Sequence, residues 1–128
     1  MVDPGLREIN HGDFESLTMQ ELKEKHAEFI TQWMADPSSV IMPNGESLQQ
    51  LQYRAWSVIK QVLDTSKDTL VVSHGMTIMT ILCKIQNLSL SQGKTVFVDI
   101  ASKTVVDLED GDGIIEIFND TAHLDHKT

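Results

Sequence analysis

The chain has 128 residues, a length that fits one domain with a core of its own. Its hydrophobic fraction of 41% and charged fraction of 23% are ordinary for a globular protein, and no apolar run approaches the ~20 residues of a membrane span. The net charge of −9 disfavours nucleic acid as a partner, because such binding uses a basic face. The N-terminus lacks the pattern of a signal peptide, and the single cysteine, Cys83, excludes an internal disulfide. We therefore expect a cytoplasmic protein that does not bind a membrane.

The first half of the chain predicts two helices. Residues 5–17 are rich in turn-forming residues and are expected to be irregular. A helix should begin after Thr18, because Thr18 and Glu21 have the spacing of a capping box, and it should end before Pro37. A second capping box at Ser47 and Gln50 opens a helix that ends near residue 65.

The middle of the chain predicts a strand followed by a helix. Residues 69–73 form an apolar, β-prone run, and an apolar helix is expected over 75–86, where Cys83 would be a buried thiol. His74 then lies between the strand and the helix N-terminus. Free backbone N–H groups and the positive end of the helix dipole favour an anion at that position. The alternative is that His74 is simply a polar residue that ends a strand.

The last third of the chain has a β pattern. Strands are expected over 95–100, 104–108 and 114–118, with a turn at 110–113 between the last two. The aspartates of this turn lack the spacing of an EF-hand, so a plain turn is favoured over a calcium loop. The order of elements predicts an α/β domain in which a mixed sheet is flanked by helices.

Four landmarks occur in order and carry a family resemblance. They are Leu6-Arg7-Glu8 followed by Gly12, then Thr18 with Glu21, then residues 43–47 with Arg54 seven residues on, and last Val-Val-Ser-His-Gly at 71–75. This ordered set resembles the histidine phosphatase superfamily, also called phosphoglycerate mutase-like, and in particular small bacterial phosphatases such as α-ribazole phosphatases. The similarity spans roughly residues 3–118.

The resemblance implies a fold and an activity. The fold would be a mixed, mostly parallel sheet flanked by helices, with a partial domain over residues 1–118 and a polar tail over 119–128. The activity would be hydrolysis of a small phosphomonoester through a phosphohistidine, without a metal or other cofactor. Glu8 matches the family's general acid, and His74, followed by Gly75, matches its second, phosphate-binding histidine. The chemistry needs both residue types. A leaving alkoxide takes a proton from an acid, and a phosphoryl group in transfer needs fixed cationic donors.

Other residues carry weaker signals with plainer explanations. Glu8 could also be an exposed loop carboxylate. Arg54 is expected to form a structural salt bridge rather than to contact substrate. His11 follows Glu8 by three residues and could approach the same site, but a surface loop histidine is the favoured interpretation. His123 and His126 have a spacing seen in metal sites, but a solvated tail is the simpler interpretation.

The departure from the family is large. The 128 residues contain no Arg-His-Gly, the family's nucleophile motif, and no Ser-x-x-x-Arg-Ala segment with its second arginine. We therefore expect a truncated member that lacks the first strand and is nearly inactive alone. Strand 69–73 would then have an unpaired edge, which predicts self-association, pairing with a separately supplied segment, or poor folding. A non-catalytic pseudo-phosphatase or interaction module is the alternative function, and a phosphoglycerate mutase is a weaker third possibility.

Overall fold

The computed structural model describes residues 1–65, 67–109 and 112–124. In chain order the helices and strands are α1 (Met19–Lys25), α2 (Ala27–Ala35), α3 (Leu48–Leu63), α4 (Gly75–Ile85), β1 (Lys103–Glu109) and β2 (Asp112–Asp120). Short 3-10 turns lie at Pro4–Leu6, Gly12–Phe14, Pro37–Ser39, Leu90–Thr95 and Ala122–Leu124. None of the described helices is long and apolar enough to cross a bilayer.

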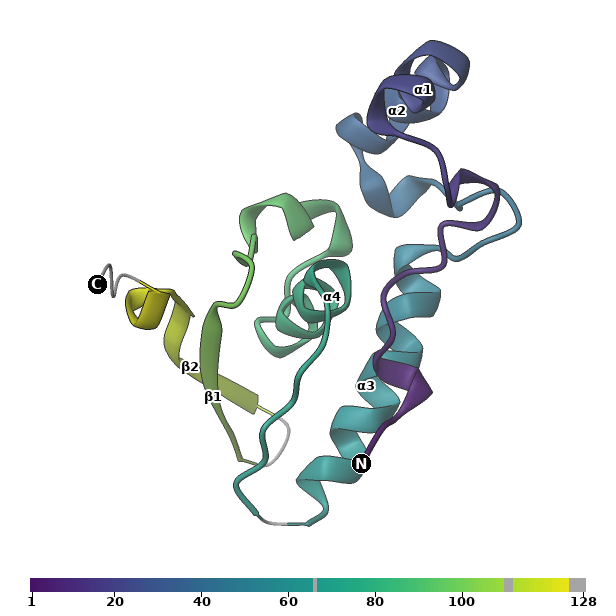
Figure 1. Ribbon diagram of the computed structural model, residues 1–128. Helices are drawn as coiled ribbons and strands as arrows, with labels where there is room; N and C mark the ends of the chain where they lie inside the picture. The colour runs from purple at the N-terminus through teal and green to yellow at the C-terminus, as the bar shows by residue number, and fades with distance from the viewer. Residues whose placement is uncertain (66, 110–111, 125–128) are drawn as a thin grey trace.

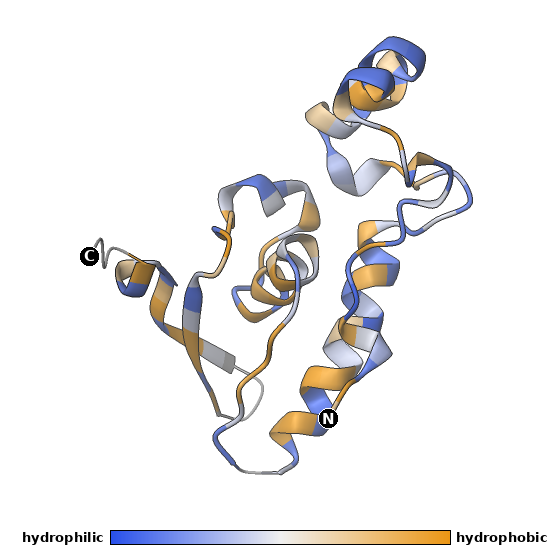
Figure 2. Ribbon diagram, in the orientation of Figure 1, coloured by the Kyte–Doolittle hydropathy of each residue, from blue (hydrophilic) through white to orange (hydrophobic). Residues whose placement is uncertain are grey.

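The core lies between α3 and α4. Figure 1 shows the two helices in the centre of the molecule, the β1–β2 hairpin beyond α4, and α1 and α2 as a protruding pair at the other end. Leu48, Leu51 and Cys83 are fully buried, and hydrophobic residues, orange in Figure 2, recur along both helices. Cys83 is therefore a buried thiol, as predicted, and burial raises its pKa.

The expected helices are largely confirmed. Both predicted capping boxes form, at Thr18 with Glu21 and at Ser47 with Gln50. In each box the hydroxyl accepts a hydrogen bond from the backbone N–H of the partner, and the partner's side chain accepts one from the backbone N–H of the Thr or Ser. The prediction of one continuous helix from 18 to 35 is wrong. His26 leaves the helical conformation and ends α1 where α2 begins. Its ring lies 4.8 Å from that of Phe14, and this aromatic contact accompanies the break.

Two expected strands do not form. Residues 69–73 are irregular, and so are 96–100, which follow the 3-10 turn Leu90–Thr95. A strand requires ladder hydrogen bonds to a neighbour, and 69–73 have no neighbouring strand in the described ranges. Leu70 and Val72 are 87% and 80% exposed, whereas Val71 packs against the core.

The described sheet is therefore the antiparallel pair of β1 and β2, which confirms the strands expected over 104–108 and 114–118. Parallel pairing, expected for most of the sheet, is absent from the described residues because 69–73 lack a partner. The predicted turn at 110–113 falls partly on residues 110 and 111, outside the described residues. β2 runs to Asp120, and Asn119 binds Asp99 through its side chain, so this strand extends into the expected tail.

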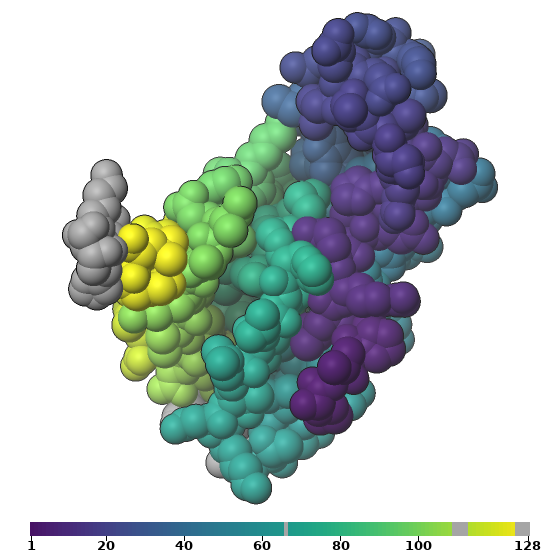
Figure 3. Space-filling view, viewed as in Figure 1, coloured from purple at the N-terminus to yellow at the C-terminus, as the bar shows by residue number. Residues whose placement is uncertain are grey.

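The N-terminal loop runs along α3. In Figure 3 it lies on the surface as a purple ridge beside teal helical residues. Gly12 has a φ of +55°, and a Cβ there would collide with the backbone carbonyl of Pro43. The same approach gives two backbone hydrogen bonds between the loops, from Asp13 to Pro43 and from Glu46 to Asn10. Glycine at this position thus joins the N-terminal loop to the loop before α3.

Replacing Gly12 by alanine tests this junction. Gly12→Ala should lower the free energy of unfolding by about 2 kcal/mol, from the left-handed backbone and the collision with Pro43. Gly75→Ala is the matched control, because a Cβ at Gly75 meets open space, and it should change stability by less than about 1 kcal/mol. Urea denaturation followed by circular dichroism measures both, and equal stability of the two variants would contradict the assignment.

Candidate active site

The carboxylate of Glu8 caps the N-terminus of α4. The backbone N–H of Met76 donates to Glu8 Oε2 (3.1 Å), and the N–H of Thr77 donates to Oε1 (3.1 Å). The N–H of Ile9 also donates to Oε1 (3.0 Å), and the hydroxyl oxygen of Thr77 lies 3.1 Å from the same atom, with its one proton shared between Oε1 and the carbonyl of Arg7. The sequence predicted an anion at this helix N-terminus, and in the structure a side chain of the chain itself supplies it.

The backbone around Glu8 is attached to the same region. Ser73 donates its hydroxyl to the carbonyl of Leu6 (2.7 Å), and buried Thr77 donates its own to the carbonyl of Arg7 (2.9 Å). Residues 6–8 therefore lie against the chain on both sides of His74. This places the general-acid candidate and the phosphate-binding candidate at the same end of α4.

Arg54, from α3, holds the other side of the Glu8 loop. Its guanidinium donates to the carbonyls of Gly5, Arg7 and Glu8 at 2.7 to 2.9 Å. It also forms a two-pronged ion pair with Glu46, with nitrogen–oxygen distances of 2.7 and 2.9 Å. A guanidinium has five N–H donors, so these five contacts occupy all of them. The prediction of a structural salt bridge is confirmed, and Arg54 in this arrangement has no donor left for a phosphate.

Glu46 completes this cluster. Its Oε2 also accepts the backbone N–H of Asn10 (2.8 Å), which joins the N-terminal loop to the loop before α3. The hydrogen bonds from the Arg54 side chain hold the pKa of Glu46 below its usual range, despite partial burial. The carboxylate therefore stays charged at neutral pH and keeps the guanidinium in place.

His74 and Gly75 are exposed at the start of α4. His74 is the N-cap residue, and its side chain makes no capping bond. The N–H groups of Met76 and Thr77 bind Glu8, and the N–H of Ile78 binds the carbonyl of His74. The N–H of Gly75 makes no hydrogen bond within the described part of the chain, and the space around Gly75 is open.

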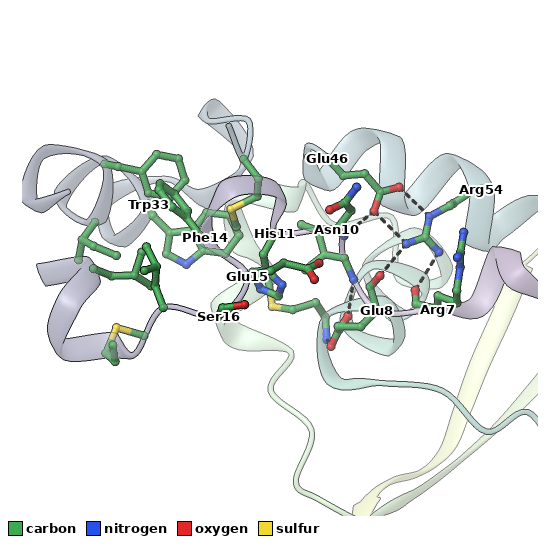
Figure 4. Close-up of a pocket in the computed structure, with 18 residues that line it drawn as sticks. Arg7, Glu8, Asn10, His11, Phe14, Glu15, Ser16, Trp33, Glu46 and Arg54 are labelled. Atoms are coloured by element: carbon green, nitrogen blue, oxygen red, sulfur yellow. Dashed lines mark hydrogen bonds and ion pairs between the residues drawn. The ribbon is translucent and has the colours of Figure 1, made fainter. Parts of the chain in front are cut away.

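A cleft of about 1020 Å³ begins at Glu8 and extends toward α1 and α2. Figure 4 shows Glu8, Asn10, Glu46 and Arg54 at one end and Phe14 and Trp33 at the other, with His11 between them. Glu8 lines this cleft, whereas His74 does not. The structure thus puts His74 beside the Glu8 loop but outside the cleft wall.

Sequence reasoning missed part of the cleft lining. Arg7 and Met76 line the cleft at the Glu8 end, and His11, judged a surface histidine, lines it as well. Of the donors of Arg7 only Nε has a partner in the described residues, the carbonyl of Pro4 at 3.2 Å. The position of Arg7 next to Glu8 was the available signal. The contribution of α1 and α2 to the cleft depends on tertiary packing and left no motif.

The comparisons identify the family. The model of the histidine phosphatase superfamily (branch 1) matches residues 1–121, and the chain belongs to this superfamily. Phosphoserine phosphatase 1 of Hydrogenobacter thermophilus is 29% identical over 119 residues, which cover 91% of this chain and 56% of the relative. The chain spans less than two thirds of the length of the two phosphoserine phosphatase relatives from this organism, 64% of one and 56% of the other.

Solved structures share the fold. YhfR from Bacillus stearothermophilus superimposes with a TM-score of 0.88 at 22% identity, over 95% of this chain and 62% of that one. The α-ribazole phosphatase from Shigella flexneri gives a TM-score of 0.79 at 21% identity, over 93% and 60% of the two chains. The expected resemblance to phosphoglycerate mutase-like proteins is therefore confirmed.

The stabilising effect of the Arg54 contacts can be separated from the effect of removing a positive charge. Arg54→Ala should lower the free energy of unfolding by about 2–4 kcal/mol, because it leaves Glu46 and three loop carbonyls without their donor. Arg7→Ala is the matched control, because Arg7 is exposed and makes one long hydrogen bond, and it should cost less than about 0.5 kcal/mol. Guanidinium denaturation measures both variants. Equal losses would show that the Arg54 contacts do not hold the loop.

Proposed function

We propose that this chain carries the general acid and a phosphate-binding histidine of a phosphohydrolase that acts on a small phosphomonoester. Glu8 donates the proton to the leaving alcohol, and His74 with the N–H of Gly75 binds phosphoryl oxygens. The observation that carries the proposal is the attachment of the Glu8 loop to both sides of His74. Membership of the superfamily supplies the chemistry.

The proposed reaction has two steps. A histidine nucleophile outside these 128 residues forms a bond to phosphorus while the ester P–O bond breaks, and the proton of Glu8 passes to the departing oxygen. Water then attacks the phosphorus of the phosphohistidine, the P–N bond breaks to release phosphate and the free histidine, and the Glu8 carboxylate takes up a proton from the attacking water. During the first step the α4 dipole and the Gly75 N–H stabilise the charge on the phosphoryl oxygens.

In the proposed role, Glu8 moves from its capping position toward the leaving group. A protonated carboxyl accepts the N–H groups of Met76 and Thr77 more weakly than a carboxylate does, so the acid form of Glu8 is held less tightly at the helix N-terminus. A bound phosphate can replace it as the anion at the helix N-terminus. Arrival of substrate would thus release the acid to the leaving group.

Phosphate binding tests the two roles separately. Inorganic phosphate or vanadate, titrated into the 128-residue chain, should perturb the ring resonances of His74 in NMR spectra. His74→Ala should weaken binding about tenfold, as for the loss of one hydrogen bond to a charged group. Glu8→Gln should keep or improve the affinity, because it removes a competing negative charge. Hydrolysis of p-nitrophenyl phosphate by the chain alone should stay close to background, because the loss of an essential nucleophile costs several orders of magnitude.

His26 provides the internal control, because it packs on Phe14 and lies away from α4. Its resonances should remain in place throughout the titration. Strong turnover that survives both His74→Ala and Glu8→Gln would refute the assigned roles. Silence of His74 at high phosphate would favour the second candidate function, a non-catalytic interaction module, which the absence of Arg-His-Gly from the sequence also favours.

We also propose that residues 69–73 pair with a further strand, from a second copy of the chain or from a separately supplied segment. The backbone groups of 69–73 have no backbone partner within the described residues, and two side chains of this segment, Leu70 and Val72, are exposed. Unpaired extended backbone with apolar side chains is a template for association. The family fold, in which a central strand lies next to this segment, supports the same interpretation.

Light scattering after size-exclusion chromatography tests this pairing. The chain should elute as a dimer or larger species, and the double variant Leu70→Lys with Val72→Lys should shift it toward monomer, because charges on an edge disfavour pairing. Met34→Lys, at a similarly exposed apolar residue on α2, is the control and should leave the mass unchanged. A well-folded monomer that unfolds cooperatively would contradict pairing with a second copy.

A further inference from the structure

The cleft has an apolar half beyond the Glu8 end. Its apolar lining comes from the N-terminal loop, α1, α2 and the loop before α3, and comprises Phe14, Leu17, Met19, Leu22, Phe29, Ile30, Trp33 and Met42. Figure 4 shows Phe14 and Trp33 grouped at the end opposite Glu8 and Arg54. The leaving group of an ester whose phosphate lies at Glu8 would extend into this half.

The aromatic rings of this half form a connected set. Phe14 and Phe29 meet edge to face, with ring centroids 4.7 Å apart, and Phe29 stacks on Trp33 at 6.3 Å. Phe14 is buried, whereas Phe29 and Trp33 are only partly buried and line the cleft. The set is therefore held in place by its own packing while part of its surface is open to a ligand.

Charge in the cleft is confined to the Glu8 end and the middle. Arg54 is saturated by its five contacts, and Glu46 is paired with it. Glu15, His11 and Ser16 lie between the two ends (Figure 4). A polyhydroxylated or charged leaving group would find few hydrogen-bond partners among the apolar residues, whereas an aromatic ring would find matching surfaces.

We propose that the apolar half is a leaving-group subsite, and that this chain prefers phosphomonoesters of aromatic or similarly flat apolar alcohols over esters of small polyols. This proposal rests on the proposed function and names its substrate class. The cleft volume of about 1020 Å³ lies just above the range of about 300–1,000 Å³ that is typical of small-molecule sites. It therefore holds an ester much larger than the phosphate group.

Tryptophan fluorescence measures binding in this half directly. The chain has two tryptophans, so Trp56→Phe leaves Trp33 as the sole reporter. Phenyl phosphate should quench Trp33 and bind about tenfold or more tightly than glycerol 1-phosphate, because the ring removes apolar surface from water. Equal affinities of the two esters would overturn the proposal.

Variants assign the preference to the cleft. Trp33→Ala, followed by calorimetry, should reduce the preference for phenyl phosphate to less than about threefold, with glycerol 1-phosphate affinity unchanged. Met34→Ala is the control, because the exposed neighbour on α2 does not line the cleft. Should Trp33→Ala fail to fold, Ile30→Ala removes lining surface with less disruption and should lower the same ratio. An unchanged ratio in a folded variant would overturn the proposal.

Inorganic phosphate and phenol separate the two proposals. Perturbation of His74 by inorganic phosphate together with equal affinity for both esters would uphold the proposed function and overturn the subsite. No binding of any phosphate compound would refute the proposed function itself. Phenol binding without binding of either ester would show an apolar cavity and would overturn its assignment as a leaving-group subsite.

Discussion

The site depends on how one irregular loop is held. Residues 5–9 have little secondary structure of their own, yet Arg54 binds three of their carbonyls and the start of α4 binds the Glu8 carboxylate. These partners lie 46 to 69 residues away in sequence. Because α3 and α4 also pack on each other to form the core, the loop is fixed by the two core helices. The carboxyl that we propose as the general acid thereby acquires a defined position on an irregular loop.

The capping bond of Glu8 links stability to chemistry. A carboxylate at the N-terminus of α4 satisfies backbone donors and interacts favourably with the helix dipole. The same donors can bind a phosphate, so in our proposal the Glu8 carboxyl and the substrate phosphate compete for one place. The N–H of Gly75 has no partner in the described residues, and in the proposal it lets both be present at the start of the exchange. Under our proposal, substrate binding both fills the anion position and frees the proton donor.

The unpaired segment 69–73 and the apolar half of the cleft are both exposed hydrocarbon, but they call for different partners. The backbone groups of 69–73 have no backbone partner in the described part of the chain, so the strand that we propose would satisfy them. The cleft has a concave wall of side chains with polar groups at one end, so a small amphipathic molecule suits it. Backbone hydrogen bonding therefore selects the partner of the segment 69–73, and shape selects the ligand of the cleft.

The sequence by itself determined the local structure of the helices and the identity of the key side chains. Capping boxes at Thr18 and Ser47 and the apolar run after Gly75 are interactions between near neighbours, which residue types alone specify. The ordered landmarks around Glu8 and His74 likewise revealed the superfamily. Strand 69–73 was predicted and did not form, because a strand needs a partner that its own sequence does not provide.

Only the tertiary structure decided what each polar group does. Contacts between segments far apart in the chain saturate the donors of Arg54 and make Glu8 the cap of α4. Such contacts also bring His11 and Trp33 into one cleft. No local pattern encodes which donor meets which acceptor across such separations. The sequence therefore supplied the chemical groups, and the packing of α3 against α4 assigned their partners.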